Sequence, residues 1–325
     1  MDKLIRSGYV NHPQQMYTLR RVTISEGKAS GVNVIEVATA GGLQVDLMPD
    51  AGLDIGQVRY KGTNISFISK NGYDNPAANI PLESEFLNSF PGGLLYTCGM
   101  RTAGGGHRDG ADWMPFHGRY HGLQADHITT SVEGDELIVG GTMRESALFG
   151  HCLELKRTIR IPIFGCEITV SDELTNLAFK DEEYTMLYHC NFGYPFLSAK
   201  TRLELDENRK TTPRTEFAAT GMDKYWKFDE PIPCEEERVF FHENMERKAA
   251  LVNEDLGIRM NMTWSETLPI LVQWRSMASG DYVCGLEPSN TYIMGRAAER
   301  ANGTLPVLKS FETVHFEVKF GFDSI

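Results

Sequence analysis

Alternation of apolar and polar side chains along short segments is the feature that most restricts how this chain can fold. Residues 153–161 read Leu-Glu-Leu-Lys-Arg-Thr-Ile-Arg-Ile, and residues 166–174 and 314–320 repeat the same pattern. Successive side chains point to opposite faces of a β-strand, whereas a helix requires a period of about 3.6 residues. Turn residues interrupt the pattern often, as expected of a β-sandwich or barrel. The sequence therefore predicts an all-β fold.

Shorter segments of the same kind occur in the first part of the chain. Residues 34–38 and 43–47 flank Gly41-Gly42 and predict a β-hairpin. Residues 53–60 and 65–68 predict two further strands, separated by a turn at Lys61-Gly62-Thr63-Asn64.

Neither a linker nor an internal repeat divides the chain, so residues 1–325 are expected to form one domain. Residues 1–30 are interpreted as a lead-in segment that crosses the surface. Only residues 241–255 have a helical alternative, because they contain several good helix formers. Few and short helices are expected elsewhere.

The composition excludes several classes of partner. The formal net charge is −12, whereas nucleic-acid binding relies on clustered Lys and Arg that neutralise phosphates. The chain has neither a long basic run nor a window of about 18 apolar residues, so no membrane surface and no membrane span are expected. Hydrophobic residues make up 41% of the chain, which is enough for a sizeable core.

The cysteines predict a reducing environment. None of them has the CxxC spacing of zinc clusters, and we interpret them as free thiols. The N-terminal segment lacks the apolar core of a secretory signal, so a cytoplasmic location is expected. The six cysteines are Cys98, Cys152, Cys166, Cys190, Cys234 and Cys284.

Residues 70–125 differ from the rest of the chain, because proline and glycine interrupt them repeatedly. Long irregular segments inside a compact domain are commonly functional. Polar side chains are concentrated here, and we interpret the segment as the rim of a pocket. The polar side chains are Arg101, His107, Arg108, Asp109, Asp112, His117, Arg119 and His121.

A histidine in an aromatic and apolar run is the principal candidate for chemistry. His189 lies in Leu187-Tyr188-His189-Cys190-Asn191-Phe192, which ends at Gly193 and Pro195. Two distant residues, His117 and Glu287, also lie beside glycine or proline. The opening of a hemiacetal ring requires a base at the anomeric hydroxyl and an acid at the ring oxygen. Glu and His have ordinary pKa values of about 4.3 and 6.5 that suit these two tasks.

Other chemistries are poorly supported. The chain contains neither a P-loop nor a GxSxG nucleophile motif. His117 and His121 are four residues apart, which on a helix could hold a metal, but two glycines flank the segment and no HExxH glutamate follows. We therefore expect neither a metal nor an organic cofactor.

Several short motifs resemble the aldose 1-epimerase, or galactose mutarotase, family over roughly residues 34–320. Residues 187–192 resemble the family segment that carries the histidine acid, and Val283-Cys284-Gly285-Leu286-Glu287-Pro288 resembles the strand that carries the glutamate base. Phe116-His117-Gly118 is similar to the earlier histidine-glycine motif. The resemblance implies a β supersandwich of large antiparallel sheets. It is closest to the divergent bacterial branch of unassigned function.

The resemblance also implies site residues. His189, Glu287 and His117 would be catalytic, and Arg101, His121, Arg119 and Asp54 would bind the substrate. Gly99-Met100-Arg101-Thr102 is similar to the family's arginine segment, but the usual Asn-Arg-Ile run before the first histidine is missing. The aspartate that reads a substrate hydroxyl stays open between Asp54, Asp112 and Asp223.

We therefore expect a cofactor-independent sugar isomerase of the aldose 1-epimerase type, acting on a small-molecule sugar. Two alternatives remain: a carbohydrate-binding or regulatory protein without turnover, and an epimerase or lyase on the same fold. The sequence leaves open which sugar is bound and whether the chain is a monomer or a homodimer.

Overall fold

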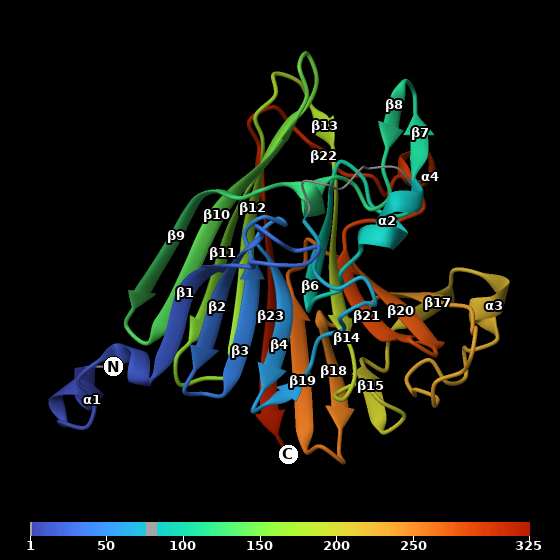
Figure 1. Cartoon of the computed structure of the whole chain (residues 1–325). Helices are drawn as coiled ribbons and strands as arrows, with labels where there is room; N and C mark the ends of the chain where they lie inside the picture. Colours follow the sequence, from blue (N-terminus) through green and yellow to red (C-terminus); the bar gives the residue numbers. More distant parts are fainter. Residues whose placement is uncertain (1, 76–82) are drawn as a thin grey trace.

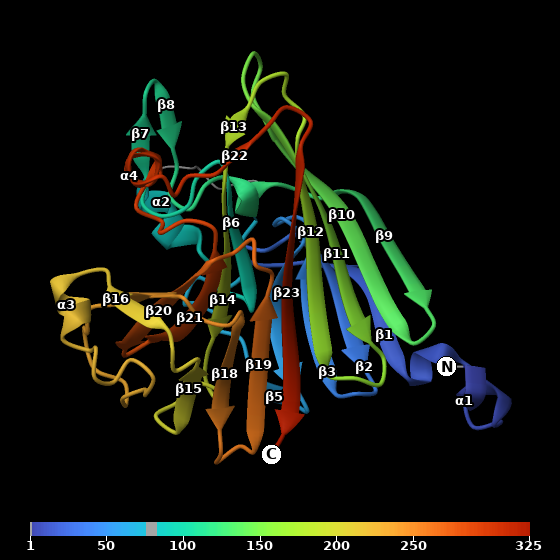
Figure 2. The same cartoon turned by 180° about the vertical axis from the view of Figure 1, so that it is seen from behind.

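Two large antiparallel sheets packed face to face dominate the computed structural model, which describes residues 2–75 and 83–325 (Figure 1). Figure 2 shows the same sheets from behind. Within the described residues the helices are few and short: α1 (Asp2–Arg6), η1 (Pro13–Gln15), α2 (Glu83–Ser89), η3 (Tyr120–Gly122), α3 (Glu216–Ala219) and α4 (Arg296–Asn302).

The larger sheet has 11 strands and contains both segments that carry the principal candidate residues. The strand β5 pairs with β4 only, at one side of the sheet. In spatial order the other strands are β1 (Tyr17–Thr23), β2 (Asn33–Thr39), β3 (Leu43–Met48), β4 (Asp54–Tyr60), β6 (Leu95–Met100), β14 (Thr185–Phe192), β21 (Asp281–Ser289), β20 (Ile270–Ala278), β17 (Arg238–Glu243) and β16 (Lys210–Pro213), with β5 at Thr63–Asn64.

The second sheet has 8 strands and contains the longest alternating segments of the sequence. Its order is β15 (Thr201–Leu205), β18 (Lys248–Asn253), β19 (Ile258–Trp264), β23 (Thr313–Ser324), β12 (Glu167–Asn176), β11 (Cys152–Pro162), β10 (Glu136–Ser146) and β9 (Asp126–Glu133). Two small ribbons complete the fold: β7 (His107–Asp109) with β8 (Asp112–Met114), and β13 (Glu182–Glu183) with β22 (Val307–Leu308).

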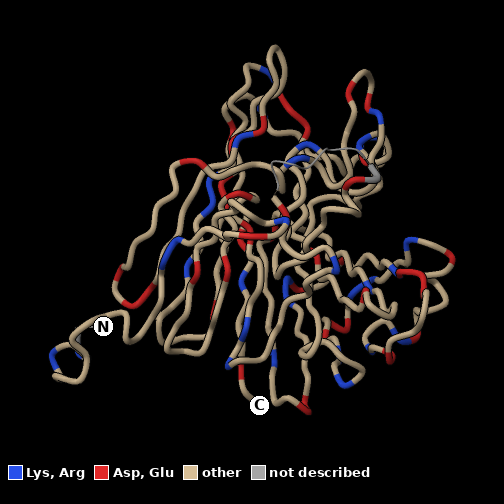
Figure 3. The backbone as a smooth tube through the Cα atoms, in the orientation of Figure 1, with Lys and Arg blue, Asp and Glu red and all other residues tan. Residues whose placement is uncertain are grey.

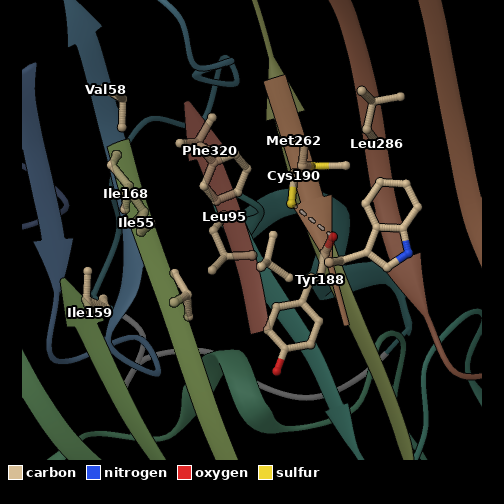
Figure 4. Packing of buried hydrophobic residues seen from close by; sticks show 14 of the residues in the cluster. Ile55, Val58, Leu95, Ile159, Ile168, Tyr188, Cys190, Met262, Leu286 and Phe320 are labelled. Carbon is tan, nitrogen blue, oxygen red and sulfur yellow. Dashed lines mark hydrogen bonds between the residues drawn. The ribbon is translucent and has the colours of Figure 1, made fainter. Parts of the chain in front are cut away.

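The main core lies between the two sheets (Figure 4). One face of it comes from the larger sheet and the other from the smaller sheet, because every second side chain of a strand points to the same side. Labelled contributors in Figure 4 include Ile55, Leu95, Cys190 and Leu286 from the larger sheet and Ile159, Ile168, Met262 and Phe320 from the smaller sheet. Burial of these apolar side chains is the main stabilising contribution to the fold.

The strand β14 is buried along its whole length because both of its faces are covered. Tyr188, Cys190 and Phe192 belong to the core between the sheets. The alternate residues His189 and Asn191 point to the outer face of the larger sheet, where a second apolar cluster packs. The alternation therefore sends every other residue of β14 toward the outer face of the larger sheet.

The predicted all-β fold of large antiparallel sheets is confirmed, and so is the hairpin, which forms from β2 and β3. The helical alternative for residues 241–255 does not occur, because these residues contribute to β17 and β18. Two expectations were wrong in detail. The lead-in at 1–30 contributes β1 to the larger sheet. Residues 65–68 make only isolated bridges at Ser66 and Ile68. Pairing with neighbouring strands overrides local propensity in such cases.

Two expectations from composition can be compared with the structure. All six cysteines are free. In residues 2–75 and 83–325, no helix combines the length and apolarity that crossing a membrane requires. Figure 3 shows Lys and Arg interspersed with Asp and Glu along the chain.

Candidate active site

A cavity of about 350 Å³ lies on the outer face of the larger sheet. His189 and Glu287 line it together with His117, and aromatic side chains form much of the remaining wall. The volume is within the usual range of small-molecule sites, about 300–1,000 Å³. The aromatic and apolar lining residues are Phe67, Phe86, Leu87, Phe90, Phe116, Val239, Val272, Trp274 and Ile293.

Strand register brings the two principal candidates together. β14 pairs antiparallel with β21, with Cys190 opposite Leu286 and Leu187 opposite Ser289. That register sets His189 opposite Glu287, and both side chains point to the outer face. Directly opposite residues of an antiparallel pair have neighbouring side chains. The distance from His189 Nε2 to Glu287 Oε1 is 3.3 Å.

Asn191 orients the imidazole of His189. The distance from His189 Nδ1 to Asn191 Oδ1 is 2.6 Å. The amide nitrogen of Asn191 donates to the carbonyl oxygens of Gly93 and of His189 itself, so its oxygen is the atom that faces the ring. His189 therefore carries its hydrogen on Nδ1 when neutral, and Nε2 can accept a proton on the side of Glu287.

Burial shifts both members of the pair toward their neutral forms. The pKa of His189 falls to about 4, chiefly because burial penalises the imidazolium, although the hydrogen bond to Asn191 opposes the shift. Burial also raises the pKa of Glu287 well above its ordinary value, and the negative charge of Glu237 adds to this effect. Glu287 Oε1 is buried without a hydrogen-bond partner. Such an acid beside such a base suits proton transfer to a ligand.

A second imidazole faces the pair from a loop. The ring of His117 is nearly perpendicular to that of His189, with centroids 5.5 Å apart. The backbone N–H of Gly104 donates to His117 Nδ1 at 3.3 Å, so the neutral ring carries its hydrogen on Nε2. Burial lowers the pKa of His117 well below its ordinary value, and the neighbouring His189 lowers it further. His117 is therefore a neutral hydrogen-bond donor.

Glycine at position 285 leaves space for the Glu287 carboxyl group. A Cβ added to Gly285 would lie 2.4 Å from Glu287 Oε1 and 3.1 Å from the Cβ of Trp274. The backbone of Gly285 and that of Trp274 are paired across β21 and β20. Any side chain at position 285 would therefore push the carboxyl group away from His189.

We expect Gly285→Ala to fold and to lose at least about tenfold in kcat/KM, since a misplacement of about 1 Å can cost on the order of 100-fold. Urea unfolding and a turnover assay would measure the two properties. Gly280→Ala provides the control, because an added Cβ at Gly280 would contact no neighbouring atom, although its φ of +87° carries some backbone strain. Equal activity in Gly285→Ala and wild type would show that the carboxyl position is not critical.

Charged side chains occupy the rim of the cavity in two pairs. Arg214 Nη2 lies 2.7 Å from Glu237 Oε1, and Lys70 Nζ lies 2.7 Å from Asp281 Oδ2. The indole nitrogen of Trp274 donates to Glu237 Oε2 at 2.7 Å. The ring of Trp274 lies 5.3 Å from that of His189, between centroids. The cavity thus combines an aromatic wall with a few directional polar groups.

The structure does not bring the predicted substrate-binding residues Arg101 and Arg119 into this cavity. Arg101 donates to Glu182 at 3.0 Å and to Asp112 at 3.1 Å. Arg119 donates to the carbonyl of Trp113 and lies 3.8 Å from Glu145. Both guanidinium groups are thus paired with nearby carboxylates outside the cavity, Arg101 with Glu182 and Asp112 and Arg119 with Glu145.

Asp54 and His121 border a separate cavity of about 270 Å³. Asp54 is bound to Arg157 at 2.5 Å and to the hydroxyl of Thr97 at 2.6 Å, so its carboxylate is engaged in the core. His121 stacks on Tyr96 with centroids 4.9 Å apart. Among residues 2–75 and 83–325, no group of three or more His, Cys, Asp or Glu could hold a metal ion.

Sequence reasoning missed four charged residues of the cavity: Lys70, Arg214, Glu237 and Asp281. None of them lies in a recognisable motif, and Arg214 and Glu237 flank β16 and β17 in ordinary polar sequence. The strand face of Trp274 could have been inferred from the sequence. Trp274 follows Val272 by two residues in an apolar strand, and such residues share a face.

The two facing antiparallel sheets give this chain a galactose mutarotase-like fold. The chain is similar to a Klebsiella pneumoniae protein described as a provisional aldose 1-epimerase, with 20% identity and a TM-score of 0.85 over 94% of this chain and 83% of that one. A galactose mutarotase-like protein from Clostridium acetobutylicum is 17% identical, with a TM-score of 0.69 over 96% and 100%. The galactose 1-epimerase of Lactobacillus acidophilus is 14% identical, with a TM-score of 0.65 over 94% and 99%.

Residues 29–322 match the family described as Domain of unknown function (DUF4432), and the chain belongs to that family. No curated protein matches its sequence. At the identities above, the similarity to solved structures defines the fold, and the chemistry has to be argued from the site.

Proposed function

We propose that this protein is a cofactor-independent aldose 1-epimerase, which interconverts the anomers of a sugar by opening and closing its ring. The observation that carries the proposal is the His189–Glu287 pair, at 3.3 Å on the wall of a cavity of about 350 Å³. The aromatic wall supports it, because apolar ring faces pack against the C–H faces of a sugar.

In the proposed reaction, the carboxylate of Glu287 removes the proton of the anomeric hydroxyl. The electron pair of that O–H bond forms the C1=O double bond as the bond from C1 to the ring oxygen breaks. The ring oxygen then takes a proton from the imidazolium of His189. After rotation about the C1–C2 bond, the reverse steps close the ring on the other face of the carbonyl. Protons balance over the cycle, and no other reactant is consumed.

The pKa values of the pair support this cycle. Ring opening leaves Glu287 protonated and His189 neutral, which is the arrangement that burial favours for both groups. Before ring opening, the imidazole of His189 holds this proton and the carboxyl group of Glu287 is ionised. The pair holds one proton in both states, so it can alternate between them while the sugar alternates between its ring and open-chain forms. We propose that His117 donates its Nε2–H to the ring oxygen and stabilises charge that develops there.

Anomer exchange measured by NMR across a panel of aldoses tests the proposal. We expect at least one aldose to exchange faster with catalytic amounts of protein than in buffer alone. Binding without faster exchange would contradict the proposal and favour a carbohydrate-binding or regulatory protein. A new double-bond absorbance from uronate-containing substrates would instead indicate a lyase.

The rate of exchange should have a broad pH optimum. Below a pH of about 4 both His189 and Glu287 are protonated, and no base remains. Above the raised pKa of Glu287 both groups have lost their protons, and no acid remains. We expect kcat/KM to fall at both limits, with apparent pKa values that belong to the pair. A pH profile in which the acid limb lies near 6.5, as for an exposed histidine, would contradict this assignment.

A further inference from the structure

The charged groups of the cavity are already paired with one another. Lys70 and Arg214 are the Lys and Arg side chains among the described residues that line it. Each lies 2.7 Å from a carboxylate oxygen, of Asp281 and Glu237 respectively. Residues 76–82 contain neither Lys nor Arg in their sequence. The positive charges of Lys70 and Arg214 in the cavity are therefore each balanced by a neighbouring carboxylate.

Glu237 has a double task in this arrangement. One carboxylate oxygen holds Arg214, and the other accepts the indole N–H of Trp274, also at 2.7 Å. Trp274 in turn lies against the ring of His189. Both oxygens of Glu237 thus hold neighbouring side chains of the cavity, Arg214 and Trp274.

We propose that Glu237 sets the charge selectivity of the cavity, so that it takes uncharged sugars and disfavours sugars that carry a phosphate or a carboxylate. The inference rests on the proposed function and names a residue that determines its substrate class. Glu237 is a specificity and positioning residue rather than a catalytic residue.

The physical reason is the availability of charge-assisted hydrogen bonds. A bound phosphate or carboxylate requires unoccupied guanidinium or ammonium donors, because removing an anion from water is costly. Here Glu237 and Asp281 compete for those donors and repel an incoming anion. Hydroxyl groups of a neutral sugar carry no such penalty, and they can still use the remaining N–H groups of Arg214.

The experiment compares glucose, glucose 6-phosphate and glucuronate, with anomer exchange measured by NMR and binding by calorimetry. We expect wild type to favour glucose over both anions. In Glu237→Gln, the amide oxygen can still accept the Trp274 N–H while Arg214 is released. The ratio of kcat/KM for anion to kcat/KM for glucose should then rise by about tenfold, the worth of one charge-assisted hydrogen bond. Arg214 and Glu237 have exposed fractions of 30% and 47%, so the variant should fold.

Glu254→Gln is the matched control, since it removes the same charge from a pair with Arg202 that lies outside the cavity. Asp281→Asn is a second test, because it releases Lys70 in the same way. A wild type that prefers an anion, or an unchanged ratio in Glu237→Gln, would overturn the inference while leaving sugar turnover intact. If no sugar is turned over, the proposed function fails, and the calorimetric ratios still decide the charge selectivity.

Discussion

Glu287→Gln should abolish most turnover while the protein stays folded and still binds sugar. The substitution keeps the size of the side chain but removes the base, and general acid–base groups contribute about 100- to 10,000-fold to a rate. Anomer exchange by NMR measures the loss in kcat, and calorimetry measures sugar binding. The exposed Glu266→Gln, at 86% exposed, is the control and should retain activity.

The same substitution should change stability in a pH-dependent way. Glu287 has its ordinary pKa in the unfolded chain, and burial raises its pKa in the folded chain. The folded chain therefore holds a proton that the unfolded chain releases, and stability falls as the pH rises from the ordinary pKa through the raised one. Gln has no such titration, so the melting temperature of Glu287→Gln relative to wild type should increase with pH.

The variant His189→Asn tests independently whether His189 and Glu287 act together in turnover. If the two residues act as one proton-transfer unit, the double variant should lose about as much activity as either single variant. If the activity losses of the two single variants multiplied in the double variant, the two residues would be acting independently. Near-wild-type exchange in Glu287→Gln would show that Glu287 is not the base.

Arg157→Met should be among the most destabilising single substitutions in the chain. Arg157 is 0% exposed and lies 2.5 Å from Asp54 and 2.7 Å from Asp172. The hydroxyl of Tyr188 also donates to Asp172 at 2.7 Å. Loss of the guanidinium would leave two buried carboxylates unpaired, and breaking a buried ion pair in this way typically costs about 3–5 kcal/mol.

Urea unfolding at pH 8 and pH 5 measures this effect. The pKa of Asp54 is already raised to about 6 by burial, which the charge of Arg157 partly offsets. Without Arg157 the carboxyl group of Asp54 should hold its proton to higher pH, so the loss of stability should be greater at pH 8. Arg160→Met on the same strand is the control and should unfold with wild type, because Arg160 lies at the surface. Neutralising both aspartates together with Arg157→Met should recover part of the loss; no recovery would show that packing, rather than charge, sets the cost.

Particular residues show how far sequence reasoning reaches. Arg157 and Asp172 occupy inward positions of two clearly alternating segments, and they lie opposite each other across β11 and β12. A charged residue on the apolar side of such a pattern is a detectable signal for a buried ion pair. Asp54, in contrast, was expected to bind substrate. Its neighbours in the sequence do not reveal that Arg157, about a hundred residues later, neutralises it.

The residues of the candidate site were likewise predicted only in part from the sequence. His189, Glu287 and His117 were expected to share a site from motif resemblance, and all three line one cavity. Their roles as acid, base and donor stay proposals that the exchange assay decides. Arg101, Arg119 and His121 lie in the same loop segment as His117, and Asp54 was one of three open aspartate candidates, yet all four contact other partners. Loop residues take their direction from contacts that local sequence does not encode.

What the sequence by itself determined is the β architecture and the face of each strand, because the alternation of apolar and polar residues is a local property of the chain. What only the tertiary structure decided is which outward residues meet. The register of β14 against β21 sets His189 beside Glu287, and the approach of the loop before β17 sets Glu237 beside Arg214 and Trp274. Both depend on pairing between segments far apart in the chain, where a shift of one residue would turn each side chain to the opposite face.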